Sequence, residues 1–473
     1  MYFNSVEFFV FFPIVYGLFW ASRNNQRLRN WILLLASYLF YGWWDWRFLS
    51  LIWISTCVDF VCARKISESG ARFWLLLSIA TNLGFLATFK YLDFFVGSFS
   101  ALATSLGFEL SAPTLGIVLP VGISFYTFQT MGYTIDVYRK RQRATDDLLT
   151  FAVYVAYFPQ LVAGPIERAS RLLPALSKRP VFSLSNIQSG LWLAYFGLFK
   201  KVAVADATAP IVESVFSKGG DVTGPEALLG VYAFALQIYC DFSGYSDIAR
   251  GISRMMGIEL ALNFRRPYFS VSPSDFWQRW HISLSSWLRD YLYIPLGGSR
   301  ASVSKTYRNL ALTMLIGGLW HGPTWMFVLW GAWHGMVLII YRVLESDVRR
   351  IRFADLRGVR RFLAGLFFFH LVCIGWLFFR AESVEQVTGF LSAMGSGFEW
   401  SDPVIARFIQ LGALALLLLF IDTVQEIWEE NGSETPVITR WPVLARGVIL
   451  FLMGLQLAVF GVDGAQTFIY FQF

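Results

Sequence analysis

The chain has 473 residues, of which 56% are hydrophobic and 15% are charged, and its formal net charge is +7. A soluble domain carries about 25% charged residues, so this composition excludes an ordinary soluble protein and indicates an integral membrane protein. The positive charge does not indicate nucleic-acid binding, because the basic residues cluster in short loops between apolar runs, as cytoplasmic loops do.

Long apolar runs recur along the chain. A membrane-spanning helix needs about 20 mostly apolar residues, so these runs predict an all-α polytopic membrane protein with about 11–13 transmembrane helices. The first run is expected to keep its N-terminus outside, because its arginines follow it. In chain order the predicted spans are 2–21, 30–45, 46–63, 72–97, 115–137, 186–205, 226–248, 308–325, 326–342, 361–380, 406–426 and 445–465.

The segment 148–166 is apolar but contains Pro159, Gly164 and Pro165. Basic loops lie on both sides of it, and they share the cytoplasmic side only if the segment does not cross. We therefore predict a re-entrant segment, which is tolerated where protein covers its broken backbone. Two features oppose this topology: Lys200 and Lys201 lie near the end of a span that leaves the cytoplasm, and the last cytoplasmic loop, 427–444, is acidic.

The stretch 263–300 is rich in Trp, Tyr and Phe but carries too many charges to cross the membrane as a free helix. An amphipathic or re-entrant segment at the cytoplasmic interface fits this composition. Its aromatic and arginine side chains could serve only as interfacial anchors.

His321 lies in the apolar run Gly318–Trp325. An ionisable side chain at membrane depth is costly and is by default a functional site, and histidine is suited to move a proton near neutral pH. Gly318 and Gly322 would let a backbone or ligand approach closely, and Pro323 would free backbone groups after the histidine. The alternative is a packing histidine bonded to a neighbouring carbonyl.

His281 lies in the aromatic stretch 263–300, directly after Trp280 and six residues after Asp275. It could be an interfacial anchor. A cytoplasmic cleft of arginines and aromatic rings would nevertheless suit an anionic donor with a purine ring, such as coenzyme A. We therefore predict substrate contacts for Asp275, Arg279, Trp280 and Trp320.

The remaining polar residues in apolar segments favour structural roles. His334 and His370 are expected to be packing histidines, and Asp247 and Arg250 are expected to pair one helical turn apart. The alternative for the carboxylates of this run, Asp241 and Asp247, is a proton relay. The cysteines predict neither a metal site nor disulfides, but small buried hydrophobic side chains: Cys57, Cys62, Cys240 and Cys373.

Several of these stretches together resemble the membrane-bound O-acyltransferase family, in its bacterial branch of alginate and exopolysaccharide O-acetylases. The matching stretches are 119–129, 157–166, 241–247, 276–293 and 318–334. The resemblance covers nearly the whole chain and implies one membrane domain, 1–473, with tilted helices around a central tunnel. It also implies a catalytic pair, with His321 as the intramembrane histidine and His281 in the Trp280-His281-Ile282 motif.

The resemblance implies an O-acetyltransferase subunit of the bacterial inner membrane, with no bound cofactor. An acetyl group from a cytoplasmic donor, acetyl-CoA, would pass through the membrane to a periplasmic acetyltransferase partner. His321 would act as general base, and His281 would orient the thioester or stabilise its oxyanion. The alternatives are transfer of D-alanine from a carrier protein to a cell-wall polymer, and a transporter that exports an acyl donor or glycan without chemistry.

Overall fold

The computed structural model describes residues 1–108, 115–347, 356–428, 441–461 and 468–469, and within these ranges the regular structure is entirely helical. The first half contains α1 (Val6–Ala21), α2 (Gln26–Asp45), α3 (Leu49–Ser69), α4 (Arg72–Leu86), α5 (Leu92–Ser105), α6 (Ile123–Tyr138), α7 (Leu148–Ala156), α8 (Phe158–Leu161), α9 (Ala169–Ser177), α10 (Leu184–Leu198), α11 (Ala207–Phe216) and α12 (Gly224–Met255). The second half contains α13 (Pro273–Trp277), α14 (Ile282–Leu288), α15 (Val303–His321), α16 (Trp325–Asp347), α17 (Gly358–Arg380), α18 (Val384–Gly395), α19 (Asp402–Trp428) and α20 (Val443–Phe460). Short 3₁₀ or π-helical turns are η1 (Trp46–Phe48), η2 (Ala87–Tyr91), η3 (Phe199–Asp206), η4 (Pro267–Phe269) and η5 (Arg289–Tyr293).

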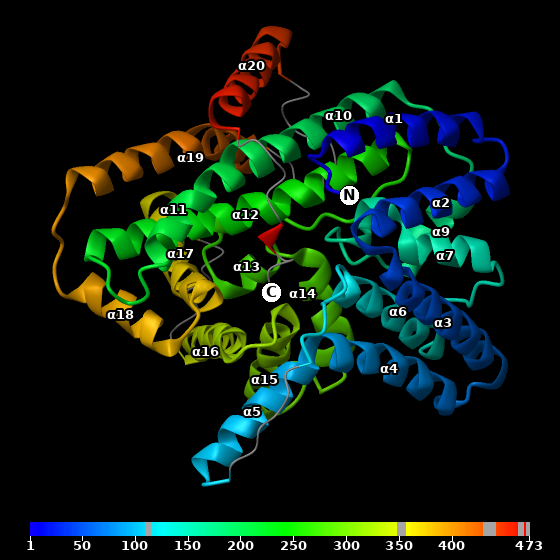
Figure 1. The fold of residues 1–473 in the computed structure, drawn as a ribbon, viewed down its shortest axis with the longest axis horizontal. Helices are drawn as coiled ribbons and strands as arrows, with labels where there is room; N and C mark the ends of the chain where they lie inside the picture. Colours follow the sequence, from blue (N-terminus) through cyan, green and yellow to red (C-terminus); the bar gives the residue numbers. More distant parts are fainter. Residues whose placement is uncertain (109–114, 348–355, 429–440, 462–467, 470–473) are drawn as a thin grey trace.

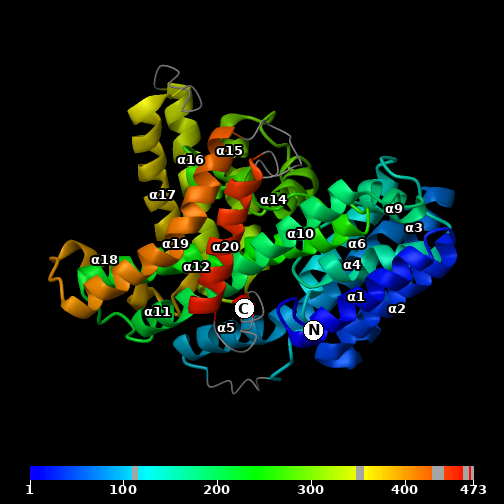
Figure 2. The same ribbon diagram turned by 90° about the horizontal axis from the view of Figure 1, so that it is seen from above.

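The helices surround a central region that holds α13 and α14 (Figure 1). Helices α1 to α4, α6, α7 and α9 lie on one side of this region, α16 to α19 lie on the other, and α10 and α12 run between them. The view from above also places α1 and α2 at the opposite end of the molecule from α18, with α16 and α17 side by side (Figure 2). The predicted all-α polytopic architecture is confirmed.

Within the part of the chain that the structure describes, seven helical stretches are long and apolar enough to cross a membrane: Gln26–Ser69, Arg72–Ser105, Gly224–Met255, Trp325–Glu345, Gly358–Arg380, Asp402–Trp428 and Val443–Phe460. The first contains two predicted spans, 30–45 and 46–63, joined through η1. The prediction for 115–137 was wrong at its start, because α6 begins only after Gly122, whose φ of 76° is left-handed. Residues 462–465 of the last predicted span lie outside the described residues.

The segment predicted as re-entrant is two short helices, α7 and α8. A helix of 9 residues such as α7 extends about 13 Å, less than half of a hydrocarbon core of about 30 Å. Every residue from 150 to 167 is buried, so protein covers the break in the helix. Gly164 is required at the turn, because a Cβ there would lie 2.3 Å from the Gln160 Cα. These features agree with re-entrance.

Helix α12 passes through the centre and packs closely along α10 (Figure 1). Glycines allow this approach: a Cβ on Gly190 would lie 2.6 Å from the Gly251 carbonyl oxygen, and one on Gly197 would lie 2.5 Å from that of Gly244. Small residues at such crossings let membrane helices come into backbone contact. The cysteines are free, but Cys57 on α3 is exposed, contrary to the prediction that all four are buried.

The two lysines that opposed the predicted topology lie in buried ion pairs. The Lys201 ammonium is 2.7 Å from an Asp206 oxygen and 2.6 Å from an Asp241 oxygen. Lys200 contacts Asp247. Carboxylates at the end of η3 and on the packed helix α12 thus compensate these charges, which explains how they are tolerated in the protein interior. The predicted pair of Asp247 with Arg250 is also present, at 3.6 Å.

Candidate active site

Two backbone hydrogen bonds between separate parts of the stretch 263–300 hold the segment around His281 in place. The Arg265 N–H donates to the Arg279 carbonyl, and the Ile282 N–H donates to the Asn263 carbonyl, both at 2.9 Å. His281 itself precedes α14 with a φ of 43° and a ψ of 54°, in the left-handed region that non-glycine residues seldom occupy. Such strained backbone persists where surrounding contacts enforce it and is common at functional sites.

Asn263 fixes the His281 side chain. Its Oδ1 accepts hydrogen bonds from the Ser283 backbone N–H at 3.3 Å and the Ser283 hydroxyl at 2.9 Å, and lies 3.1 Å from His281 Nδ1. Because a backbone N–H can only donate, this oxygen is the acceptor and His281 Nδ1–H donates to it. Among the described residues, Nε2 has no hydrogen-bond partner. In the neutral imidazole Nε2 therefore presents a lone pair.

His321 is the last residue of α15, and α16 starts after a short turn at Trp325. The glycines predicted to permit close approach do so: a Cβ on Gly318 would lie 2.2 Å from the Phe327 carbonyl oxygen, and one on Gly322 would lie 2.1 Å from the Phe327 ring. The sequence thus packs α15 directly against α16 and leaves the histidine at the buried corner between them.

The two predicted catalytic histidines come together although they lie on different elements. Their ring centroids are 6.4 Å apart, and both side chains are buried. Trp320 contacts both rings, with centroid distances of 5.8 Å to His281 and 5.1 Å to His321. Phe125 stacks on His281 at 6.2 Å. Three of the six predicted site residues therefore form one aromatic-walled cluster.

Trp280, also predicted to contact substrate, is fully buried among aromatic rings. Its nearest ring contacts are Trp376 at 4.7 Å and Phe264 at 5.0 Å. In this position it packs the segment that carries His281. Its contact with substrate stays a prediction.

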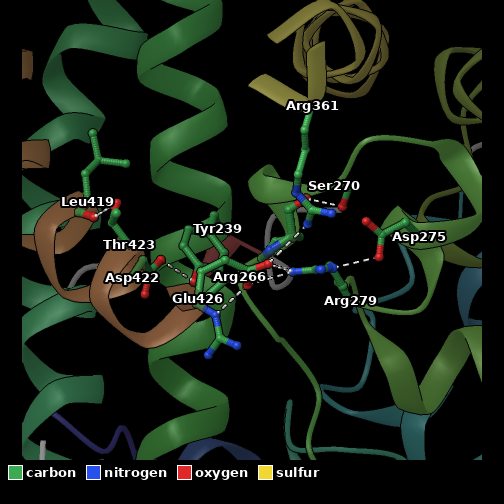
Figure 3. Close-up of polar contacts among 11 residues, drawn as sticks. Tyr239, Arg266, Ser270, Asp275, Arg279, Arg361, Leu419, Asp422, Thr423 and Glu426 are labelled. Atoms are coloured by element: carbon green, nitrogen blue, oxygen red, sulfur yellow. Dashed lines mark hydrogen bonds and ion pairs between the residues drawn. The ribbon is translucent and has the colours of Figure 1, made fainter. Parts of the chain in front are cut away.

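Arg279 and Asp275 form part of an ionic cluster that sequence reasoning did not assemble (Figure 3). Arg279 donates to Asp275 at 2.7 Å and to Glu426 at 2.9 Å, and Glu426 also pairs with Arg266 at 2.9 Å. Burial opposes the charge of Arg279, but its bonds to the two carboxylates raise the pKa of its guanidinium. Glu426 lies on α19, far along the chain, so no local motif could indicate it. The predicted substrate contacts of Arg279 and Asp275 stay predictions.

His334 and His370 have the surroundings of packing histidines. His370 is satisfied at both ring nitrogens, with the Leu366 carbonyl 2.7 Å from Nδ1 and the Tyr232 hydroxyl 2.8 Å from Nε2. The His334 ring stacks parallel to Phe276 at 6.1 Å.

Lys90 is a site residue that sequence reasoning missed. Its Nζ lies 2.7 Å from the Trp320 carbonyl oxygen and 3.0 Å from that of His321. The available signal was a lysine inside the predicted span 72–97, where an ionisable side chain marks function by default.

Two cavities adjoin the cluster. One of about 40 Å³ is lined by Lys90, Ser124, Trp320 and His321, among others. A second, of about 740 Å³, lies beside α11, α16 and α17, and its lining includes Phe327 and Phe379. Phe379 also contacts the His321 ring, with centroids 5.4 Å apart. The histidine thus borders the first cavity directly and is separated from the second by one aromatic side chain.

Comparison with known proteins identifies a family for this arrangement. The membrane-bound O-acyltransferase family profile matches residues 137–381, a range that contains His281 and His321. The chain is 40% identical to the probable alginate O-acetylase AlgI of Pseudomonas putida over 99% of each chain. It is 36% identical to the peptidoglycan O-acetyltransferase of Helicobacter pylori over 83% of this chain and 79% of the relative. It is 32% identical to the teichoic acid D-alanyltransferase of Streptococcus thermophilus over 46% of this chain and 56% of the relative.

Proposed function

We propose a function from the premise that this chain belongs to the membrane-bound O-acyltransferase family and is a multi-pass membrane acyltransferase. In this proposal it passes acetyl groups from a cytoplasmic thioester donor to a polysaccharide acetylation system across the membrane. The observation that carries the proposal is the meeting of His281 and His321 in one buried cluster, with ring centroids 6.4 Å apart. Two imidazoles at this separation can act on one acceptor hydroxyl and one acyl group.

In the proposed transfer, the acceptor oxygen bonds to the acetyl carbonyl carbon and the carbon–sulfur bond of the thioester breaks. His321 takes the hydroxyl proton as general base, and this proton ends on the departing sulfur, which leaves as a free thiol. A positioned general base typically contributes about 10²–10⁴-fold in rate. The Nε2 lone pair of His281 orients the acceptor by accepting a hydrogen bond from a donor other than the reacting hydroxyl, whose one proton goes to His321. The sequence predicted that His281 orients the thioester or stabilises its oxyanion. The Nδ1–H bond to Asn263 leaves Nε2 as a hydrogen-bond acceptor, which supports a contact with the acceptor molecule instead of oxyanion stabilisation.

We propose acetyl-CoA as the donor, approaching from the side of the basic loops, which would be the cytoplasmic side of a bacterial inner membrane. The two arginines of the ionic cluster, Arg266 and Arg279, lie on the segment that carries His281, and arginines bind phosphate groups well. A phosphate of the donor would replace the Glu426 carboxylate as the partner of these arginines.

We propose that the acceptor side is the cavity of about 740 Å³, whose lining includes Arg380, Asp206, Glu213 and Glu382. These residues lie in or next to the stretches 206–226 and 381–405, which contain one lysine and no arginine and are therefore expected on the outer side of the membrane. The acceptor would be a periplasmic acetyltransferase partner, which then acetylates an alginate-type exopolysaccharide. The support for this polymer is the 40% identity over 99% of the chain to a relative named for alginate.

A second candidate within the same class is D-alanyl transfer from a carrier protein to a cell-wall polymer. It is favoured by the 32% identity to a teichoic acid D-alanyltransferase, although that likeness covers 46% of this chain. Transfer from a D-alanyl carrier protein with no use of acetyl-CoA would establish this candidate instead. The non-catalytic transporter is set aside, because the family is one of acyltransferases.

The test is the O-acetyl content of exported polysaccharide in cells whose only copy carries His321→Ala. His370→Ala is the matched control, since both ring nitrogens of His370 are occupied by packing contacts. We expect loss of acetyl groups in the first strain and wild-type content in the second, at equal membrane abundance. Retained acetylation with His321→Ala would refute the proposed mechanism.

A further inference from the structure

The attack of a hydroxyl on a thioester places negative charge on the carbonyl oxygen, and enzymes stabilise that oxygen with a positioned donor. His281 does not provide one in its neutral form, because its Nδ1–H bonds Asn263 and its Nε2 carries a lone pair. The site therefore needs another donor close to His321.

Lys90 is brought to the end of α15 by the π-helical turn η2, which interrupts the long helical stretch Arg72–Ser105. Turns of this kind are frequent at functional sites. The Lys90 ammonium donates to the Trp320 carbonyl at 2.7 Å and the His321 carbonyl at 3.0 Å. Tyr91, the next residue, donates its hydroxyl to the Leu319 carbonyl at 3.0 Å. Both side chains thus cap carbonyls at the end of this helix.

In its protonated form Lys90 has three N–H protons, and the capping bonds account for two of them. Among the described residues, its third hydrogen-bond contact is with the Ser124 hydroxyl at 3.5 Å, which is longer than the usual range of about 2.7–3.2 Å for a donor nitrogen and an acceptor oxygen. The ammonium also lies 5.9 Å from the centroid of the Trp320 ring. Lys90, Ser124 and His321 line the same cavity of about 40 Å³. That volume can hold one small polar group, and Lys90 has a proton to give it.

We propose that Lys90 is a catalytic residue that donates its third N–H to the carbonyl oxygen of the acetyl group bound beside His321. As the acceptor oxygen adds to the carbonyl carbon, the carbonyl π electrons move onto this oxygen, and they return when the carbon–sulfur bond breaks. Lys90 keeps all its protons and stabilises the charge in between. This inference rests on the proposed thioester chemistry and assigns the stabilisation of its oxyanion to Lys90.

The competing explanation is that Lys90 only caps α15, where a cation at a helix C-terminus is favourable. Tyr91 provides the matched control, because it caps the same helix end but is absent from the lining of the small cavity. Tyr91→Phe should therefore reproduce a capping defect without removing the donor. Lys65→Met, at an exposed lysine that pairs with Glu68, controls for the loss of a positive charge.

The experiment uses inverted membrane vesicles from cells whose only copy is wild type, Lys90→Met, Lys90→Arg, Tyr91→Phe, Lys65→Met or His321→Ala. Transfer of labelled acetyl from acetyl-CoA to vesicle polysaccharide gives KM for the donor and, once divided by the amount of the protein in the vesicles, kcat. The O-acetyl content of polysaccharide exported by the parent cells is the second readout. Loss of one oxyanion donor typically lowers kcat by about 10²–10³-fold, so we expect such a fall for Lys90→Met with KM for the donor little changed. Lys90→Arg should recover part of the rate.

Tyr91→Phe and Lys65→Met should stay near wild type. Wild-type kcat in Lys90→Met, or an equal fall in Tyr91→Phe, would overturn the inference while leaving the proposed function intact. If wild type and His321→Ala gave the same acetylation in both readouts, the proposed function and this inference would fail together. If Lys90→Met is scarce in the membrane, Lys90→Arg decides: a normally abundant, fully inactive arginine variant would contradict the donor role.

Discussion

Asn263→Ala should remove the hydrogen bond that orients the His281 ring while leaving the histidine itself unchanged. The Asn263 side chain makes four hydrogen bonds, to His281, twice to Ser283 and once to the Ser246 hydroxyl, and it is completely buried. At roughly 0.5–1.5 kcal/mol net for each bond, their loss predicts a destabilisation of about 4 kcal/mol. The added cost of leaving buried donors without an acceptor acts in the same direction.

The activity should fall by more than the loss of folded protein explains. Without Asn263 Oδ1, the His281 ring can rotate or carry its proton on Nε2, and the lone pair no longer points to the acceptor. We expect roughly a 10-fold fall in acetyl transfer per folded molecule, a fraction of the about 10²–10⁴-fold that a positioned acid–base group contributes.

A double-mutant cycle measures this coupling. Melting in detergent gives the fraction folded, and acetyl transfer in vesicles gives the rate for Asn263→Ala, His281→Ala and the double variant. If Asn263 acts through His281, its substitution should cost no further activity once His281 is absent. Fully additive losses in rate would refute the reasoning, as would wild-type activity in the single Asn263 variant.

Three further predictions concern buried groups. Burial raises the pKa of Glu167, between α8 and α9, from 4.5 to about 7, so its contribution to stability is complete below pH 4.5 and is lost as pH rises through about 7. Between about pH 5.5 and about pH 8 the melting temperature of Glu167→Gln should therefore fall less than that of wild type. An equal fall would contradict this assignment. Gly375→Ala places a Cβ 2.5 Å from His334 Nε2 and should cost about 1–3 kcal/mol, seen as a lower melting temperature; no change would mean that the imidazole moves freely. Lys201→Met leaves two buried carboxylates uncompensated and should cost about 3–5 kcal/mol, whereas Lys218→Met, at an exposed pair, should cost less than about 1 kcal/mol; equal melting temperatures for the two variants would refute the difference.

The sequence was sufficient for features that depend on local composition. Apolar runs predicted the helical membrane protein, and Pro159 and Gly164 predicted the break that separates the short helices α7 and α8. Both features depend on consecutive residues, which is why the sequence was sufficient for them. The unusual settings of His281 and His321 nominated both histidines, and glycine spacing predicted the close packing around His321.

Only the tertiary structure decided which distant groups meet. Asn263 determines which ring nitrogen of His281 carries the proton. Glu426, on another helix, forms an ion pair with Arg279. Lys90 donates a hydrogen bond to the His321 carbonyl from a π-helical turn. Each contact depends on how the helices cross, and helix crossings are set by side-chain packing over the whole domain rather than by any local pattern. For the same reason the sequence indicated two candidate histidines, while their common cluster and its neighbouring cavities emerged only from the fold.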